Sequence, residues 1–469
     1  MTEVFAGRRF WLAVVVVVVL AVGLRLAGLG RWPFASDELG TFNEVALFHN
    51  PPNPITHPDQ AVPRVIPLSM LVLDAGYRLF GRNEFGCRLL ISLLGVAHVA
   101  VVTVGLSRVA PRAVALTAGV WLAVAVEHIF YSQYHRFYTL AALLVASATL
   151  AAARSVRTGS GRWMTAACVL AGLAVLAHTL AGAVFGVLLI GGAVSAVAGR
   201  WKPALVATVG AVAAAGGFAL VILPVIGAKA GLTSWTGLSS LHAALGAIVQ
   251  VSWPVCVLAV PGAVVLWRQD REQGAFWIGA AGVWAGMAAV LPAVLPYHSA
   301  YIFPFALPMF VLAATAVVEA ATAVRERAGP TAGWLVWVGL PLLNLPALAS
   351  YYQDGNRHDL RTAAAYVAER IGPADRVISN EPDKLAHYRP ALVPHLVHVP
   401  RAASPQDAVG AVPPGGRLWV VCSGGRGGFE PEWQEWVHQH CHLQTTVSRT
   451  RYDYYAFSVW VFRTPPLSP

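Results

Sequence analysis

Long apolar runs alternate with short polar linkers over the first 350 residues of the chain. A helix needs roughly 20 mostly apolar residues to cross a bilayer. Runs of that length, or slightly shorter, recur in eleven places, at residues 10–29, 88–107, 113–130, 137–153, 163–178, 180–198, 204–226, 246–267, 275–295, 300–323 and 332–350. This pattern predicts a polytopic α-helical membrane protein with about 11 transmembrane helices.

The basic residues follow the same alternation. Starting from the N-terminal tail, every second linker is basic, and this set holds thirteen Lys or Arg residues, at positions 8, 9, 108, 112, 154, 157, 162, 200, 202, 268, 271, 325 and 327. After the first loop, the other set holds only Arg136 and Lys229. Because positive residues are enriched on cytoplasmic loops, we expect a cytoplasmic N-terminus and an outer C-terminus.

Residues 64–80 could pass for a twelfth span, but counting them would put every later basic linker outside. They also carry Arg64, Asp74 and Arg78, the last two spaced to meet on one helical face. We therefore predict an amphipathic juxtamembrane helix at the outer interface. The first outer loop then extends over residues 30–87, within a transmembrane domain of residues 1–350.

Residues 351–469 are more polar and predict an extracytoplasmic soluble α/β domain. A helical pattern covers residues 357–372, with Asp359 as N-cap and Gly372 just past the end. Short apolar runs at 375–380, 417–424 and 456–464 predict strands. Cys422 and Cys441 could pair in an oxidising compartment, but the sequence does not decide this.

Composition supports the membrane assignment, with 57% hydrophobic and 12% charged residues. The net charge of +10 lies largely on the short linkers, and no long basic run or zinc-ligand spacing accompanies it. We therefore expect membrane lipids as partners and exclude nucleic acid.

Two adjacent carboxylates, Asp37 and Glu38, follow the first span within the segment SDELGTFNE at residues 36–44. A carboxylate in a partly dry interfacial site can act as a general base or orient a nucleophile. The alternative is a structural role, in which Ser36 or Asp37 caps a surface helix. The pattern alone does not choose between them.

A second polar segment, residues 127–140, lies between the third and fourth spans. Arg136 is its only cation and is flanked by His135 and by Tyr134 and Tyr138. A lone outer arginine suits recognition of an anionic group such as phosphate. The alternative is an interfacial belt of Tyr and Arg at the helix ends.

Several other polar residues fall within or near helix ends. Glu127 and His128 are metal-ligand types, but two neighbours do not make a coordination shell. The sequence therefore leaves open whether a divalent metal ion binds, and its ligands are unknown. His98, in mid-span, is most simply a helix-contact residue.

Together these motifs resemble the GT-C class of glycosyltransferases, which use polyprenyl-phosphate sugars, and especially its dolichyl-phosphate-mannose mannosyltransferase-like and aminoarabinose-transferase-like members. The resemblance covers residues 1–200 well, weakens in the later spans and recovers at residues 358–378. It rests first on an acidic pair, Asp37-Glu38, and a His-Pro stretch, His57-Pro58. A G-x-x-E-x-x-x-R element follows, with Gly81, Glu84 and Arg88. The last two motifs are a Y-S-Q-x-x-R-x-Y signature from Tyr131 to Tyr138 and a His at the end of the fifth span, His178.

The resemblance implies transfer of a sugar from a polyprenyl-monophosphate donor to a glycan, lipid or protein acceptor, with inversion. It also implies that the reaction takes place on the extracytoplasmic face of a bacterial plasma membrane. Asp37 would be the catalytic carboxylate, with Glu38 supporting it or acting in its place. Arg136 would bind the donor phosphate, assisted by His135 and Tyr138. The remaining substrate-site candidates are His57, Asp59, Tyr131, His178, His298 and Tyr301.

A lipid or glycan flippase is the main alternative. Transporters need polar residues along a path through the membrane midplane. Here the centres of the spans are nearly free of charge, and the polar residues gather towards one face. This favours an interfacial enzyme, and a non-catalytic scaffold stays as a third option.

Overall fold

The computed structural model describes residues 7–49, 66–221, 252–294, 301–354, 357–397, 404–423, 431–447 and 459–467. The chain divides into two compact units. The transmembrane unit comprises Met1–Leu29 and Thr41–Leu348, and the C-terminal unit comprises Gly30–Gly40 and Ala349–Pro469. Residues 30–40 therefore group with the C-terminal residues, although the sequence placed them in a loop of the transmembrane domain.

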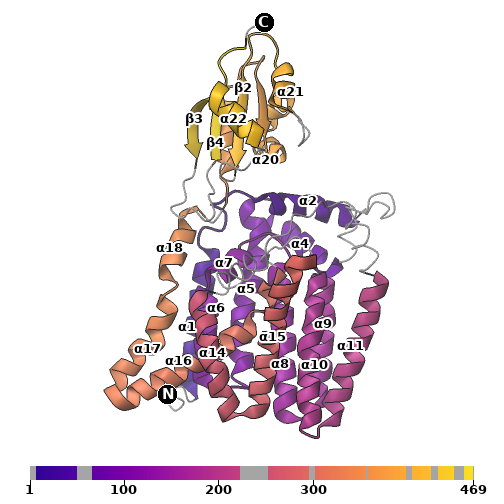
Figure 1. The fold of residues 1–469 in the computed structure, drawn as a ribbon, viewed down its shortest axis with the longest axis vertical. Coiled ribbons are helices and arrows are strands. Elements are labelled where there is room, and N and C mark those ends of the chain that lie inside the picture. The colour runs from indigo at the N-terminus through magenta and orange to yellow at the C-terminus, as the bar shows by residue number, and fades with distance from the viewer. Residues whose placement is uncertain are drawn as a thin grey trace. The chain divides into compact units, whose positions relative to one another are not determined.

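Helices dominate the first 354 residues (Figure 1). In chain order they are α1 (Arg8–Leu26), α2 (Ser36–His49), α4 (Pro67–Phe80), α5 (Glu84–Leu106), α6 (Arg112–Val124), α7 (Val126–Ser132), α8 (Tyr138–Thr158), α9 (Gly161–Ala177), η3 (Thr179–Ala183), α10 (Val184–Val197), α11 (Trp201–Val221), α14 (Trp253–Gln269), α15 (Arg271–Val294), η5 (Phe303–Phe305), α16 (Leu307–Ala328), α17 (Pro330–Leu342) and α18 (Leu345–Asp354).

Over the described residues, each predicted span coincides with one of these helices or with two in succession. Among the described residues, seven helices are long and apolar enough to cross a membrane, or eight if α6 and α7 form one bent span. α9 and α14 are apolar but shorter, at 17 residues each. The chain is thus a polytopic α-helical integral membrane protein.

The third predicted span, residues 113–130, is not a continuous helix. It breaks at Ala125, and α6 and α7 meet there at 63°. The predicted juxtamembrane helix does form, as α4, which has 14 residues and is thus shorter than a typical span. Its Asp74 and Arg78 form the expected ion pair at 2.8 Å.

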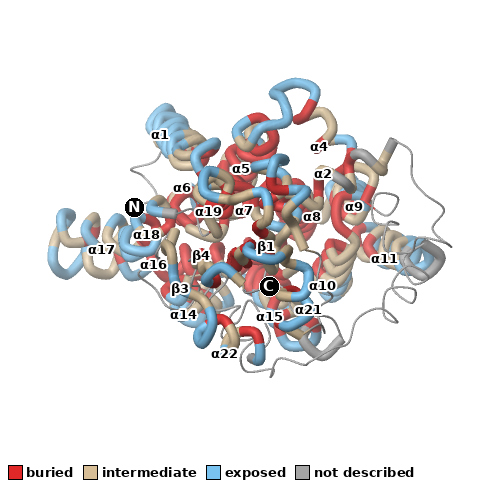
Figure 2. The backbone as a smooth tube through the Cα atoms, turned by 90° about the horizontal axis from the view of Figure 1, so that it is seen from above, coloured by how far each residue is buried: buried red, intermediate tan, exposed pale blue. Residues whose placement is uncertain are grey.

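Small residues let the transmembrane helices pack closely. A side chain at Gly262 in α14 would meet the backbone oxygen of Leu312 in α16 at 1.8 Å. Likewise a side chain at Gly119 in α6 would meet the Thr103 hydroxyl of α5 at 2.1 Å. Such close approach is typical of helix pairs in membranes. Figure 2 shows α1 and α17 at the rim of the unit, each with a mixture of exposed and intermediate residues. On α1 the exposed residues include Trp11 and Val16, as expected for a surface covered by lipid.

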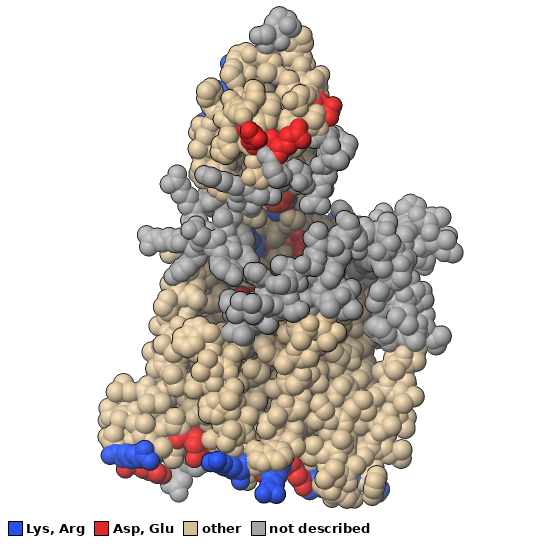
Figure 3. Space-filling view, viewed as in Figure 1, with Lys and Arg blue, Asp and Glu red and all other residues tan. Residues whose placement is uncertain are grey.

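The basic linkers predicted to be cytoplasmic meet at one end of this unit. Arg154 donates to the backbone oxygen of Arg108 at 3.0 Å. Arg200 pairs with Glu272 at 2.8 Å and also contacts the backbone oxygen of Val156. Figure 3 shows Lys and Arg, with some acidic residues, gathered at this end beside a belt that is free of both on the visible face. The shared sidedness of these linkers agrees with the predicted alternation.

The C-terminal unit contains a four-stranded sheet in the order β1-β2-β4-β3, made of β1 (Arg376–Ser379), β2 (Leu418–Ser423), β4 (Val459–Arg463) and β3 (His442–Val447). β1 pairs parallel to β2, whereas β4 pairs antiparallel to both β2 and β3. The predicted α/β class and three of the strands agree with this sheet. β3 was not predicted.

Helices cover both faces of the sheet. α19 (Leu360–Ala368) packs on one face, against Trp419 and Val421 among others. α22 (Pro431–His440) packs on the other, against Leu418 and Val420. The alternation along β2 is what allows each face to be apolar. Asp359 caps α19 as predicted, accepting from the Thr362 backbone N–H at 3.0 Å, but the helix ends at Ala368 rather than near Gly372.

Candidate functional site

The signature segment after α7 holds the end of the first helix in place. The Gln133 amide donates to the backbone oxygens of Arg25 at 2.8 Å and Ala27 at 2.9 Å. The last carbonyls of a helix have no partner within it, so Gln133 satisfies groups that α1 leaves free. Arg88, from the G-x-x-E-x-x-x-R element, donates to the backbone oxygen of Leu29 at 3.1 Å. Both motifs thus fix the chain where it leaves α1.

Replacing Gln133 by Leu should lower the free energy of unfolding by about 1–3 kcal/mol, because buried carbonyls lose their partner. The measurement is the thermal midpoint of the purified protein in detergent. Gln269→Leu is a matched control, since its amide bonds only the exposed Glu319. Equal midpoints for both variants would contradict the anchoring role.

His135 has both ring nitrogens engaged inside the transmembrane unit. Its Nδ1 lies 2.9 Å from the Cys87 backbone oxygen, which can only accept, so Nδ1 carries the hydrogen. Its Nε2 then accepts from the Tyr77 hydroxyl at 2.5 Å. In this arrangement His135 holds the signature segment to α4 and α5, and its predicted assistance at the donor phosphate stays a prediction.

Arg136 is only partly exposed, with 14% of its side chain accessible. Its guanidinium donates to Glu44 at 3.0 Å and to the Thr41 hydroxyl at 2.9 Å. It also lies over the ring of Phe137, at 4.8 Å from the centroid. A fixed guanidinium of this kind can receive an anionic oxygen, and Glu44 is the group with which that oxygen would compete.

The aromatic candidates of this unit form a connected set of rings. Tyr138 lies 5.5 Å from Tyr131 and 5.6 Å from His178, measured between ring centroids. His178 in turn lies 6.0 Å from Tyr301. The structure thus brings four candidates together, whereas His57, Asp59 and His298 lie outside the described residues.

The acidic pair lies in the C-terminal unit, and its two members differ. Asp37 is exposed, whereas Glu38 is fully buried. One carboxylate oxygen of Glu38 accepts from the Ala35 backbone N–H at 2.9 Å and from the Arg357 guanidinium at 3.2 Å. The helix-cap interpretation named Ser36 or Asp37, but α2 starts at Ser36 and the capping acceptor is Glu38.

A second carboxylate, that of the partly buried Glu381, bonds Ser36 beside this pair. It accepts from the Ser36 hydroxyl, from Lys384 and, at 2.5 Å, from the Ser423 hydroxyl. Burial alone would raise the pKa of Glu381, but Lys384 and the two hydroxyls lower it below its ordinary value. The ionised Glu381 therefore stabilises the fold at pH values above its ordinary pKa. This stabilisation is lost as the pH falls through the lowered pKa.

A polar network missed by the sequence analysis lies at the break between α6 and α7. The fully buried Arg25 donates to the backbone oxygens of Leu122 and Ala123, each at 3.1 Å, which the break leaves without helical partners. It also donates to Nδ1 of His128 at 2.6 Å. Because a guanidinium only donates, Nε2 of His128 carries the hydrogen and donates to His98 at 2.8 Å.

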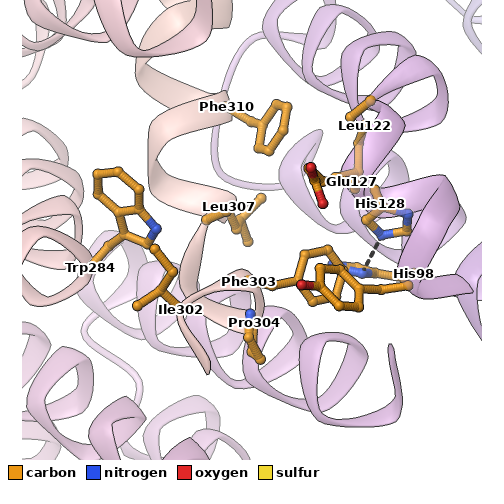
Figure 4. A pocket seen from close by; sticks show the side chains of 13 residues that line it. His98, Leu122, Glu127, His128, Trp284, Ile302, Phe303, Pro304, Leu307 and Phe310 are labelled. Atoms are coloured by element: carbon orange, nitrogen blue, oxygen red, sulfur yellow. Dashed lines mark hydrogen bonds between the residues drawn. The ribbon is translucent and has the colours of Figure 1, made fainter. Parts of the chain in front are cut away.

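A small cavity adjoins this network (Figure 4). His98, His128 and Glu127 line it together with aromatic residues, and Figure 4 shows Glu127 pointing into the space bounded by Leu307 and Phe310. His98 thus contacts another helix, as the sequence indicated.

No three His, Cys, Asp or Glu side chains in the described part of the chain lie close enough together to hold a metal ion. Cys422 and Cys441 are free thiols in the structure and belong to one hydrophobic cluster. Burial raises the pKa of each to about 12, so few thiolates are present at neutral pH.

No protein-family model and no curated protein matches the chain. Solved structures do. ArnT from Cupriavidus metallidurans, bound to undecaprenyl phosphate, superposes with a TM-score of 0.56 at 16% identity, over 97% of this chain and 98% of that one. The archaeal oligosaccharyltransferase AglB from Archaeoglobus fulgidus, in complex with an inhibitory peptide and a dolichol-phosphate, gives 0.55 at 12% identity, over 96% and 74%.

The chain has the GT-C fold. The resemblance that its motifs predicted is therefore confirmed at the level of the fold. Because the match extends over almost the whole chain, it includes both the transmembrane unit and the C-terminal unit. Fold alone does not establish function.

Several residues that the sequence analysis passed over contribute to these clusters. Arg25 carried a signal, since a charged residue within a predicted span is costly and is retained for a reason. Glu44 ends the acidic segment at residues 36–44, and Arg357 begins the helical pattern at residues 357–372. Glu381 carried no local signal for its contacts with Ser36 and Ser423, because these two hydroxyls lie 345 and 42 residues away in the chain.

Proposed function

We propose that this protein is an integral-membrane glycosyltransferase, which moves a sugar from a polyprenyl-monophosphate donor to an acceptor on the extracytoplasmic face, with inversion. The observation that carries the proposal is the match over nearly the full length to a structure that holds undecaprenyl phosphate and to one that holds a dolichol-phosphate. A donor with such a tail stays in the bilayer, so its enzyme must work at the interface.

Asp37 is the proposed catalytic carboxylate, because it is the exposed member of the acidic pair. Its role is to accept the proton of the incoming hydroxyl or to orient that hydroxyl. Glu38 is the proposed supporting residue, since its carboxylate is committed to Arg357 and to the backbone of Ala35.

Arg136 is the proposed donor-phosphate ligand. The departing polyprenyl phosphate gains negative charge as the glycosidic bond breaks, and a fixed cation stabilises that charge. Tyr138, together with Tyr131, His178 and Tyr301, is proposed to contact the substrate through the ring cluster described above.

The test is incubation of the purified protein with a panel of radiolabelled polyprenyl-phosphate sugars and of glycan, lipid and protein acceptors. The proposal expects label to move to one acceptor class, with release of polyprenyl phosphate. Proton NMR of the product should show the opposite anomeric configuration to the donor. Retention of configuration would overturn the inversion part alone.

The proposed topology has its own test. Reporter fusions at Gly159, which follows α8, and at Gly372 in the C-terminal unit should report cytoplasm and outside respectively. The reason is the shared sidedness of the basic linkers. The opposite result at either position would overturn the extracytoplasmic assignment of the carboxylates.

A further inference from the structure

Residues 30–40 are tied to the C-terminal residues at successive points along the segment. The backbone oxygen of Arg31 accepts from Arg361 at 2.5 Å, and the Phe34 backbone N–H donates to the Tyr388 hydroxyl at 2.6 Å. The ring of Trp32 lies 5.3 Å from that of Tyr351. These contacts explain why the segment forms one compact unit with residues 349–469 rather than with the helix that precedes it.

Two further contacts flank Asp37, one on each side. On one side the Ser36 hydroxyl donates to Glu381. On the other, Glu38 accepts from Arg357 at 3.2 Å, and neither side chain of this pair is exposed. Asp37 itself is exposed. Its backbone is therefore held from both sides while its carboxylate stays accessible.

Glu381 and Arg357, which bond Ser36 and Glu38, each have further partners in the same unit. Glu381 pairs with Lys384, whose side chain is 3% exposed, and accepts from Ser423 in β2. The Arg357 guanidinium lies over the ring of Trp32, 5.9 Å from the centroid. A buried ion pair adds little net stability compared with well-packed apolar side chains, so it is weak support for a purely stabilising role.

We propose that Arg357 and Glu381 are positioning residues, which fix the Asp37 carboxylate through its neighbours Glu38 and Ser36. The inference rests on the proposed function, since it takes Asp37 as the catalytic carboxylate. The C-terminal unit then contributes to turnover directly, by setting where the base stands. Displacement of a catalytic group by about 1 Å can cost ~10²-fold in rate.

Two mild variants test the proposal. Ser36→Ala removes one hydroxyl from an exposed residue, and Arg357→Lys keeps the charge but loses the Nε–H that Glu38 accepts. Each should lower kcat by about 10- to 100-fold while the donor KM changes less than about twofold. Ser36→Thr, which keeps the hydroxyl, should restore most of the rate.

Matched controls lie in the same unit. Ser404→Ala removes a hydroxyl that bonds an exposed Asp407, and Arg370→Lys alters an exposed pair with Glu369. Both should leave kcat unchanged. Loss of rate in these controls equal to that in the test variants would mean a general effect on the unit, and would overturn the positioning role.

Hydrogen–deuterium exchange of residues 30–40 tests, without an activity assay, whether Arg357 and Glu381 hold this segment in place. Ser36→Ala and Arg357→Lys should each speed exchange in this segment, and unchanged exchange in both would overturn the proposal. Faster exchange with normal kcat, in a protein that Asp37→Asn inactivates, would overturn it too. Full activity of Asp37→Asn would instead refute the proposed role of Asp37, and the inference about its positioning with it.

Discussion

Replacing Asp37 by Asn should lower kcat by ~10²-fold or more, the range expected when a general base is removed. Asn keeps the shape and the hydrogen-bonding reach of Asp but cannot accept a proton. The donor KM and the thermal midpoint should change little, because Asp37 is exposed. Steady-state transfer from a radiolabelled polyprenyl-phosphate sugar measures both constants.

Asp383→Asn is the matched control, since Asp383 is an exposed carboxylate of the same unit. Glu38→Gln should cost less in kcat than Asp37→Asn but should lower the thermal midpoint, because it removes the carboxylate from a fully buried ion pair. If Asp37→Asn is active while Glu38→Gln is folded but inactive, then Glu38 is the catalytic carboxylate and Asp37 the supporting residue. Activity in both would place the chemistry elsewhere.

Replacing Arg136 by Ala should raise the donor KM by roughly 10- to 150-fold. A hydrogen bond to a charged group contributes about 1.5–3 kcal/mol, and each 1.4 kcal/mol is tenfold in binding. Arg136→Lys should lie between Ala and the wild type, because it keeps the charge but loses the planar fork. The measurement is the dependence of the initial rate on donor concentration.

Glu44→Gln separates this role from a structural one. If Arg136 binds the donor phosphate, removing the competing carboxylate of Glu44 should leave donor use unchanged or improve it. If Arg136 serves only to hold α2 through Glu44 and Thr41, then Glu44→Gln should reproduce the loss seen in Arg136→Ala. That second outcome would return Arg136 to the interfacial-belt interpretation.

Hydropathy and charge were sufficient to predict most of the fold, because lipid imposes long apolar helices and the linkers carry the sidedness. The break at Ala125 was not predictable from the local pattern. It depends on Arg25, about a hundred residues earlier, which satisfies the freed carbonyls of Leu122 and Ala123. β3 was missed for a different reason: it is an edge strand with polar, partly exposed residues and shows no apolar run.

The candidate site divides in the same way. Motif order predicted the acidic pair, Arg136 and the aromatic residues as site candidates, because each of these motifs is local in sequence. The distinction between an exposed Asp37 and a buried Glu38 required the partner of Glu38, which lies 319 residues away. The bonds of His135 to Tyr77 and Cys87 likewise appear only in the folded chain, and its suggested assistance at the donor phosphate stays a prediction.

The central claim is that the protein breaks the bond between sugar and polyprenyl phosphate rather than carrying the intact lipid across the membrane. Single-turnover incubation in proteoliposomes, with protein in excess over a radiolabelled polyprenyl-phosphate sugar and with acceptor present, measures both fates at once. We predict that free polyprenyl phosphate and labelled acceptor appear in equal amounts, and that Asp37→Asn abolishes both. Movement of the intact labelled lipid between leaflets, with no labelled acceptor, would contradict the claim and favour a flippase.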